Sequence, residues 1–150
     1  MNPNIKHKVI YDAYGKRQSE SYLLNNTFHN EDGPAVINYY HNETVSHKFY
    51  FANGLLHRSN GPALIKYCAK GSLFIEKYYL CGKLYNDNGP AIIEYDVNEK
   101  EKYCEYWLND VFFNKNEFYS ERITLIREIG REIEVPIVKL KYYDSVLPYV

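Results

Sequence analysis

A repeat of 28 residues is the feature of this chain that most restricts its fold. Three tetrads share the pattern Asp/Asn-Gly-Pro-Ala, and their Gly-Pro pairs recur at that spacing: Gly33 and Pro34, Gly61 and Pro62, and Gly89 and Pro90. The same frame holds for a tyrosine that lies eleven residues before each glycine and for another that lies six residues after it. A fixed period of this length is typical of arrays in which each unit packs against its neighbours.

Each unit is predicted to consist of short strands and tight turns. Asn53-Gly54 suits the positive φ angles of a two-residue hairpin turn, and three pairs occupy the same place in the other units: Asn25-Asn26, Cys81-Gly82 and Asn109-Asp110. In each tetrad we expect the glycine to adopt unusual backbone angles and the proline to begin the next strand. The residues that follow alternate, so that one face of each strand is apolar and the other is mixed.

Two ladders of large side chains follow from stacking at this period. One ladder holds Tyr22, Tyr50, Tyr78 and Tyr106, and the opposite face holds Leu23, Phe51, Tyr79 and Trp107. Aromatic side chains of this kind pack internally more often than they bind partners, so we expect both ladders to pack mostly inside the array or against the C-terminal segment, and either is a candidate for the core. Whatever part of Tyr50, Phe51, Tyr78, Tyr79, Tyr106 and Trp107 stays exposed is the candidate binding surface.

The ends of the repeat are degenerate. The frame continues weakly into residues 8–16 and 106–113, which lack the tetrad. We divide the chain into a repeat region at 1–114 and a C-terminal segment at 115–150. The units of the repeat region are 1–21 (partial), 22–49, 50–77, 78–105 and 106–114 (partial).

The C-terminal segment is predicted to pack on the array. Asn114 and Glu117 are spaced as a helix cap, and apolar residues at helical spacing predict a helix over 115–133. Residues 137–143 alternate as a further strand. The predicted fold is therefore mainly β: an antiparallel array of about four units with a C-terminal helix and a terminal strand. An array that does not close leaves edge strands, for which residues 106–108 and 8–12 are the candidates.

Composition excludes several classes of function. The formal net charge is −1, which disfavours nucleic acid as a partner, and no stretch has the length of a membrane span or the apolar core of a secretion signal. The cysteines at 68, 81 and 104 form no CxxC pair, so the sequence predicts neither a disulfide framework nor a cysteine zinc site. We expect a soluble intracellular protein without a metal or cofactor.

Few residues suggest catalysis. His29 and His57 occupy equivalent positions, where two neighbouring imidazoles would suit a metal ion or proton transfer, but the next units carry Tyr85 and Phe113. A ladder of side chains at the solvent edge explains that pattern better. The motifs GxSxG, GxGxxG and the P-loop do not occur in the sequence. We therefore expect no enzyme.

The unit YFANGLLHRSNGPALIKY resembles the MORN-like (membrane occupation and recognition nexus) repeat, in the GPA-containing form found in large DNA viruses and some phages. The resemblance covers residues 8 to 116 and departs from the ordinary MORN unit, which is shorter and richer in glycine. It implies an elongated antiparallel β array that serves in assembly or partner binding, and it implies no catalytic residues. The abundance of Tyr, Asn, Lys and Ile is consistent with an AT-rich, mimivirus-like genome.

From these observations we expect a viral interaction or structural protein, either a minor virion component or a binder of a host protein. It would reside in the virion or the host cytoplasm, form oligomers where its edges allow, and act through a sheet face or an open edge. Two alternatives stay open. One is a membrane-surface adaptor, which the MORN resemblance alone suggests, and the other is a small hydrolase that uses His29 or His57.

Overall fold

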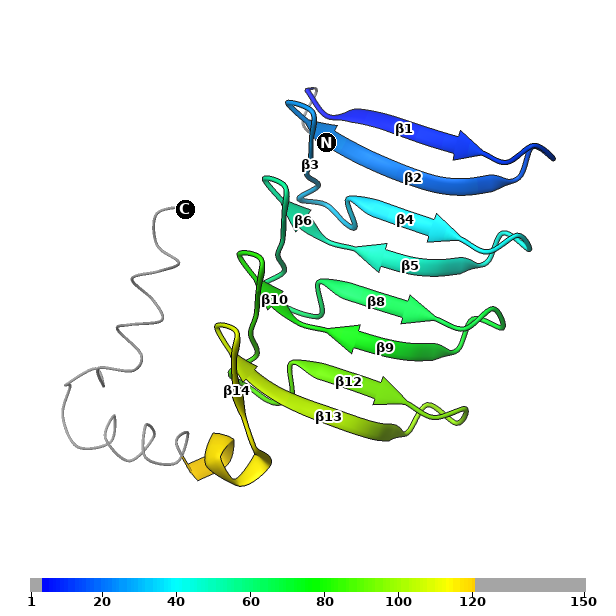
Figure 1. Cartoon of the computed structure of the whole chain (residues 1–150). Coiled ribbons are helices and arrows are strands. Elements are labelled where there is room, and N and C mark those ends of the chain that lie inside the picture. Colours follow the sequence, from blue (N-terminus) through cyan, green and yellow to red (C-terminus); the bar gives the residue numbers. More distant parts are fainter. Residues whose placement is uncertain (1–3, 121–150) are drawn as a thin grey trace.

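The fold is a single long antiparallel sheet with a second, narrower layer of short hairpins along one side (Figure 1). The computed structural model describes residues 4–120. The described chain contains these strands: β1 (Lys6–Tyr11), β2 (Arg17–Leu24), β3 (Thr27–Phe28), β4 (Val36–Tyr39), β5 (Val45–Phe49), β6 (Phe51–Ala52), β7 (Leu55–Leu56), β8 (Leu64–Tyr67), β9 (Leu73–Lys77), β10 (Tyr79–Leu80), β11 (Lys83–Leu84), β12 (Ile92–Tyr95), β13 (Glu101–Leu108) and β14 (Val111–Phe113). The predicted mainly β, antiparallel class is confirmed.

The main sheet is a stack of long hairpins whose distal turns all lie on one side (Figure 1). Its strand order is β1-β2-β4-β5-β8-β9-β12-β13-β14, and β3 pairs with β2. Successive hairpins join in one register, because Ile37 pairs with Glu20, Ile65 with Lys48 and Ile93 with Glu76. Equivalent residues therefore lie on one face, in a row that crosses the whole sheet.

The strands are interrupted at Tyr50 and Tyr78, each of which precedes a short hairpin, whereas β2 and β13 run on through Tyr22 and Tyr106. After Tyr50, residues 51–52 pair with residues 55–56, and after Tyr78, residues 79–80 pair with residues 83–84. The turn residues at 25–26, 53–54, 81–82 and 109–110 all have positive φ, between 50° and 81°. The prediction of four such turns is confirmed. Asn, Asp and Gly tolerate this conformation best, which explains their presence there.

The Gly-Pro loops differ in part from the expectation. Strands β4, β8 and β12 begin at Val36, Leu64 and Ile92, two residues after each proline. Gly61 has a φ of 159°, but Gly33 and Gly89 are absent from the residues with positive φ. A Cβ atom at Gly33 would lie 3.7 Å from the Asn30 amide nitrogen, an ordinary contact. The prediction of unusual backbone angles is therefore wrong at Gly33 and Gly89. Steric crowding does not explain why glycine occurs at these two positions either.

Polar side chains hold these loops in shape. The Asn30 side-chain amide donates to the Pro34 carbonyl oxygen at 3.0 Å, and the Asn86 amide donates to that of Pro90 at 2.8 Å. In the middle loop the Arg58 guanidinium takes this place and donates to Pro62 at 3.3 Å. Buried carbonyl groups need such partners when a loop has no ladder to supply them.

The core lies where each Gly-Pro loop enters the main sheet. Ala35, Ala63 and Ala91 are fully buried there. Their carbonyl oxygens accept hydrogen bonds of 2.7 to 2.8 Å from the backbone N–H groups of Tyr22, Tyr50 and Tyr78. The alanines thus mark the junction at which one long hairpin is joined to the next.

A helix at residues 115–120 closes the last unit. Its cap is reciprocal, as predicted: the Glu117 N–H donates to Asn114 Oδ1 and the Asn114 N–H donates to Glu117 Oε2, both at 3.0 Å. The Phe118 ring, 2% exposed, lies against the Tyr106 ring with centroids 5.0 Å apart. The remainder of the helix predicted over 115–133 and the strand predicted at 137–143 lie outside the described residues.

Replacing Asn114 by alanine should lower the free energy of unfolding by about 1 kcal/mol, because the Glu117 N–H then loses its acceptor. Chemical denaturation measures this loss. The exposed neighbour Asn116 provides a control, since Asn116→Ala leaves the cap intact and should change stability by less than about 0.5 kcal/mol. Equal losses in the two variants would show that the cap does not stabilise the helix.

One edge prediction is confirmed and the other is wrong. The strand predicted at 8–12 corresponds to β1, which ends the sheet and pairs only with β2. Residues 106–108 are not an edge, because Tyr106, Trp107 and Leu108 pair with Phe113, Phe112 and Val111 of β14. The hairpin turn at Asn109-Asp110 returns the chain along these residues, so that β14 covers their outer edge.

Candidate functional site

The layer of short hairpins carries a continuous line of apolar side chains. Directly paired residues point to the same face of a hairpin, and here four such pairs occur. Backbone hydrogen bonds link one hairpin to the next, for example from Gly54 N–H to Phe28 O at 2.9 Å and from Gly82 N–H to Leu56 O at 2.8 Å. We call this line the apolar row: Leu23, Phe28, Phe51, Leu56, Tyr79, Leu84, Trp107 and Phe112.

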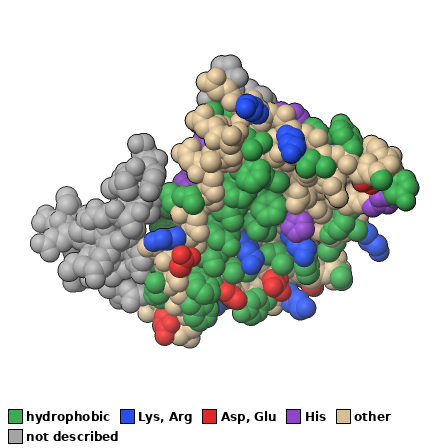
Figure 2. Space-filling view, turned by 45° about the horizontal axis from the view of Figure 1, so that its top comes forward, with side chains coloured by type: hydrophobic (Ala, Val, Ile, Leu, Met, Phe, Trp, Pro, Cys, Tyr) green, Lys and Arg blue, Asp and Glu red, His purple; other side chains and the backbone are tan. Residues whose placement is uncertain are grey.

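The apolar row is only partly covered. Phe28 is 39% exposed and Phe112 is 56% exposed, while its other members have intermediate exposure. Phe28 and Phe51 are in ring contact across two hairpins at 5.4 Å, and Phe51 continues onto Phe49 of the main sheet at 6.3 Å. Figure 2 shows hydrophobic side chains gathered across the middle of the face in view, with charged side chains both above and below them.

The structure separates the six predicted binding residues into two groups. Phe51, Tyr79 and Trp107 lie in the apolar row and are half-buried. Tyr50, Tyr78 and Tyr106 belong to the other ladder and lie beside the Gly-Pro loops or the helix. The Arg58 guanidinium lies 3.9 Å from the Tyr50 ring centroid, and Phe118 packs on Tyr106. Tyr106 is buried at 7% exposed, while Tyr50 and Tyr78 are half-buried, as the aromatic residues of the row are.

Five members of the apolar row were not among the predicted site residues: Leu23, Phe28, Leu56, Leu84 and Phe112. A signal for them was present in the sequence. A two-residue turn pairs the residue two before it with the residue two after it, so the turn at 53–54 implies that Phe51 faces Leu56. Applied to every unit, this rule yields the complete row.

A cavity of about 660 Å³ lies between two adjacent Gly-Pro loops. Its floor includes Tyr78, Leu80 and Ile93, and its walls are the segments 58–61 and 85–90. Burial raises the pKa of the Tyr78 hydroxyl, so this group stays protonated at neutral pH. The lining contains no cysteine or histidine, and Asp87 supplies its carboxylate. The cavity therefore has no pair of groups that would act together as a nucleophile and a base.

The two predicted histidines each connect one unit to the next. His29 Nδ1 accepts a hydrogen bond from the Asn53 backbone N–H at 3.1 Å, and His57 Nδ1 accepts one from the Cys81 N–H at 3.1 Å. His29 is 7% exposed, so the expectation of a ladder at the solvent edge is wrong for this residue. A ring nitrogen that accepts a backbone hydrogen bond must be unprotonated, which gives both rings a structural role.

Acid should weaken the hydrogen bond between the Cys81 N–H and His57. Burial lowers the pKa of His57 below its usual 6.5. The unfolded chain therefore takes up a proton before the folded one does, so stability is complete above about pH 6.5 and falls as the pH drops. The contribution is limited to one proton, or about 1.4 kcal/mol per pH unit.

The pH dependence of unfolding in His57→Tyr checks this prediction, because Tyr85 occupies the equivalent place in the next unit. Denaturation at several pH values between 4.5 and 7 should show a shallower slope in the variant than in the native chain. Carboxylates with lowered pKa values, such as Asp96, act at lower pH and are the same in both proteins. Identical slopes would contradict a role for His57.

Cys81 and His57 form the contact that most resembles a nucleophile and its base. The Cys81 Sγ lies 3.4 Å from His57 Nδ1, a neighbour that sequence reasoning missed. The same ring nitrogen already accepts the Cys81 N–H, and Cys81 has a φ of 50° as part of the hairpin turn. Nδ1 is thus engaged by the backbone, which favours a structural contact over an activated thiolate.

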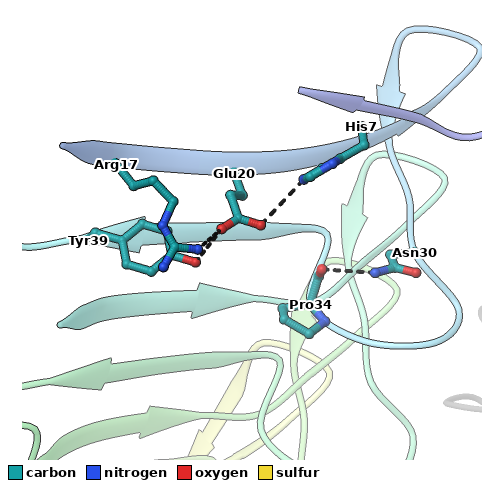
Figure 3. A network of polar contacts seen from close by, with 6 residues as sticks. All are labelled: His7, Arg17, Glu20, Asn30, Pro34 and Tyr39. Atoms are coloured by element: carbon teal, nitrogen blue, oxygen red, sulfur yellow. Dashed lines mark hydrogen bonds and ion pairs between the residues drawn. The ribbon is translucent and has the colours of Figure 1, made fainter. Parts of the chain in front are cut away.

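The main sheet also holds a carboxylate network (Figure 3). Glu20 Oε1 accepts from the Tyr39 hydroxyl at 2.6 Å and from Arg17 Nη1 at 2.7 Å, and Glu20 Oε2 lies 3.3 Å from His7 Nε2. The Tyr39 hydrogen bond lowers the pKa of Glu20, and burial raises the pKa of Tyr39 to about 12. A carboxylate held ionised in this way is a hydrogen-bond acceptor and a poor general acid.

The position that holds Glu20 in one unit holds a residue of opposite charge in the next. The Tyr95 hydroxyl donates to Glu76 Oε2 at 2.7 Å, as Tyr39 does to Glu20. In the unit between them the equivalent residue is Lys48, whose Nζ lies 5.6 Å from the Tyr67 ring centroid. The order Glu20, Lys48, Glu76 along the sheet separates the two carboxylates by a cation.

Within residues 4–120 no group of three or more His, Cys, Asp or Glu side chains is arranged to hold a metal ion. The described part of the chain also has no helix with the length and apolar character needed to cross a lipid bilayer. Comparison with protein-family models, with curated proteins and with solved structures found no match.

Proposed function

We propose that this protein is a non-enzymatic interaction module that binds an apolar segment of a partner protein along the apolar row. The observation that carries the proposal is the row itself: eight apolar side chains aligned over four hairpins, with Phe28 and Phe112 exposed at its two ends and the other six half-buried. Contiguous apolar side chains that reach the surface of a protein mark interaction sites.

The composition of the row supports a protein as the ligand. It contains Phe51, Tyr79 and Trp107, and aromatic residues are enriched at protein interfaces because they bury a large area with few rotatable bonds. Tyr79 and Trp107 add polar tips. The Trp107 indole N–H already donates to Glu105 Oε2 at 2.6 Å, which fixes its ring for contact.

The proposed setting is viral, and the partner is a host protein or a virion protein. The support is the resemblance to GPA-containing MORN-like repeats and the abundance of residues with AT-rich codons. The absence of a nucleophile with its base in the cavity beside Tyr78 agrees with a binding role.

Site-specific photocrosslinking tests this function. A photoreactive phenylalanine at Tyr79, in the row, should capture a defined partner from particles or infected cells. The same residue at Tyr14, which is 82% exposed on a distal turn, is the matched control and should not capture it. Phe28→Ser, at the exposed end of the row, should reduce capture at position 79.

Binding of the captured partner can then be measured by fluorescence, because Trp107 is the single tryptophan of the chain. Occupation of the row should shift its emission to shorter wavelength. Capture of the same proteins from positions 79 and 14, or no capture from position 79, would overturn the proposal.

A further inference from the structure

Both ends of the main sheet present a strand with one free edge. β1 pairs only with β2, and residues 101–105 of β13 pair only with β12. In the repeat frame the next strand after β13 would begin near residue 120, but residues 115–120 form the helix. The described chain therefore supplies no strand to either edge, and the unpaired backbone groups there can accept a partner strand.

The internal junctions define the register that such a partner would follow. At the three junctions the same positions pair, in steps of 28 residues. These are Val36, Ile37 and Asn38 with Ser21, Glu20 and Ser19; Leu64, Ile65 and Lys66 with Phe49, Lys48 and His47; and Ile92, Ile93 and Glu94 with Lys77, Glu76 and Ile75. The equivalent positions are 8, 9 and 10 in β1 and 105, 104 and 103 in β13.

Applied to two copies of the chain, this register brings together complementary side chains. Lys8 of one copy faces Glu105 of the other, and Ile10 faces Tyr103. Ile10 is 40% exposed and Tyr103 is 51% exposed, so both have apolar surface to bury. Opposite charges and aromatic–aliphatic pairs are the cross-strand pairs that stabilise sheets.

The backbone groups are aimed correctly for the same register. At the junctions Tyr22, Tyr50 and Tyr78 donate their N–H groups to the alanine carbonyls, and hydrogen-bonded pairs recur at every second residue of an antiparallel ladder. By this alternation Cys104 and Val9 form a hydrogen-bonded pair, with their free N–H and C=O groups directed at the partner.

Symmetric pairing of like edges is less favourable. Two β1 edges paired about His7 would place Lys6 of each copy opposite Lys8 of the other, and two β13 edges paired about Tyr103 would place Glu101 opposite Glu105. Like charges facing each other destabilise a strand pair. The charges therefore favour contact between unlike ends.

We propose that copies of this chain associate head to tail, with β13 of one copy paired to β1 of the next in the register of the internal junctions. A contact between unlike ends does not close on itself by a two-fold axis, so it extends the sheet from copy to copy. This association does not involve the apolar row and does not depend on partner binding there.

A disulfide trap tests the proposed register. Val9→Cys places a thiol opposite the native Cys104 of the next copy. The Cα atoms of a hydrogen-bonded pair lie about 5.5 Å apart, within disulfide range. Within one copy, β1 and β13 are seven strands apart in the sheet, about 34 Å at ~4.8 Å per strand, so only an intermolecular bond forms. Cys68 and Cys81 are replaced by serine throughout.

Mild oxidation of the full chain should give a ladder of linked dimers, trimers and longer species, with the 9–104 disulfide identified by mass spectrometry. Ile10→Cys is the matched control: its side chain points to the opposite face from Cys104, and the ladder should be lost. Links between two copies of position 9, between two copies of Cys104, or no links at all would overturn the proposal.

Sedimentation velocity checks the same contact without a disulfide. Native protein should form larger species as its concentration rises, and Lys8→Glu should abolish this because it faces Glu105 of the next copy. Lys8 is exposed, so the fold should persist, and Lys70→Glu on a distal turn is the control. A monomer at every concentration, or association unchanged in Lys8→Glu, would contradict the head-to-tail contact.

Discussion

Phe118→Ala is expected to lower the free energy of unfolding by about 3 kcal/mol, in line with large-to-small changes at buried aromatic residues. The Phe118 ring is 2% exposed and contacts the rings of Tyr106 and Tyr119. Its removal uncovers Tyr106 and leaves a gap at the last unit. Chemical denaturation measures the loss.

Hydrogen exchange would show where the loss occurs. Amides of β13 and β14 should lose protection in Phe118→Ala, while those of β1 and β2, at the other end of the sheet, should keep it. Tyr119→Ala is the control, since Tyr119 is 37% exposed and its removal should cost much less. Equal losses at both ends of the sheet would contradict a local role for Phe118.

Ala63→Leu is expected to lower the free energy of unfolding by about 1 to 3 kcal/mol through overpacking. Ala63 is fully buried where a Gly-Pro loop joins the main sheet, and its carbonyl oxygen accepts the Tyr50 N–H at 2.7 Å. A larger side chain must displace either the loop or the strand. Thermal or chemical denaturation gives the size of the effect.

The chain supplies its own controls for this substitution. Ala35 and Ala91 occupy the same environment, so leucine there should have similar effects. Ala69 lies exposed on a distal turn, and Ala69→Leu should leave stability within about 0.5 kcal/mol. A tolerated leucine at all three buried positions would show that the junctions are loosely packed.

Local chemistry made much of the backbone predictable. Asn53-Gly54 and the equivalent pairs specify positive φ angles over two residues, and Asn114 with Glu117 specifies a helix start. These signals depend only on nearby residues, so they need no knowledge of the tertiary structure. The alternation of Ala63, Ile65 and Tyr67 likewise follows from strand geometry alone.

The division between core and surface was not predictable in the same way. Tyr50 and Phe51 are adjacent, large and apolar, and both are half-buried, one against Arg58 and the other against Phe28 of the preceding unit. The role of His57 also depends on a residue 24 positions away, the Cys81 N–H of the next unit. Such contacts are set by the stacking of units, and a pattern within one unit does not contain them.

The alternating signs of Glu20, Lys48 and Glu76 restrict how such a chain can change its length. Equivalent residues of neighbouring units lie two strands apart, about 10 Å at ~4.8 Å per strand. Loss of the unit that carries Lys48 would therefore bring the Glu20 and Glu76 carboxylates to this distance from each other. Loss of the unit that carries Glu76 would instead leave Glu20 beside Lys48. A 28-residue deletion that removes Lys48 should therefore cost more stability than one that removes Glu76.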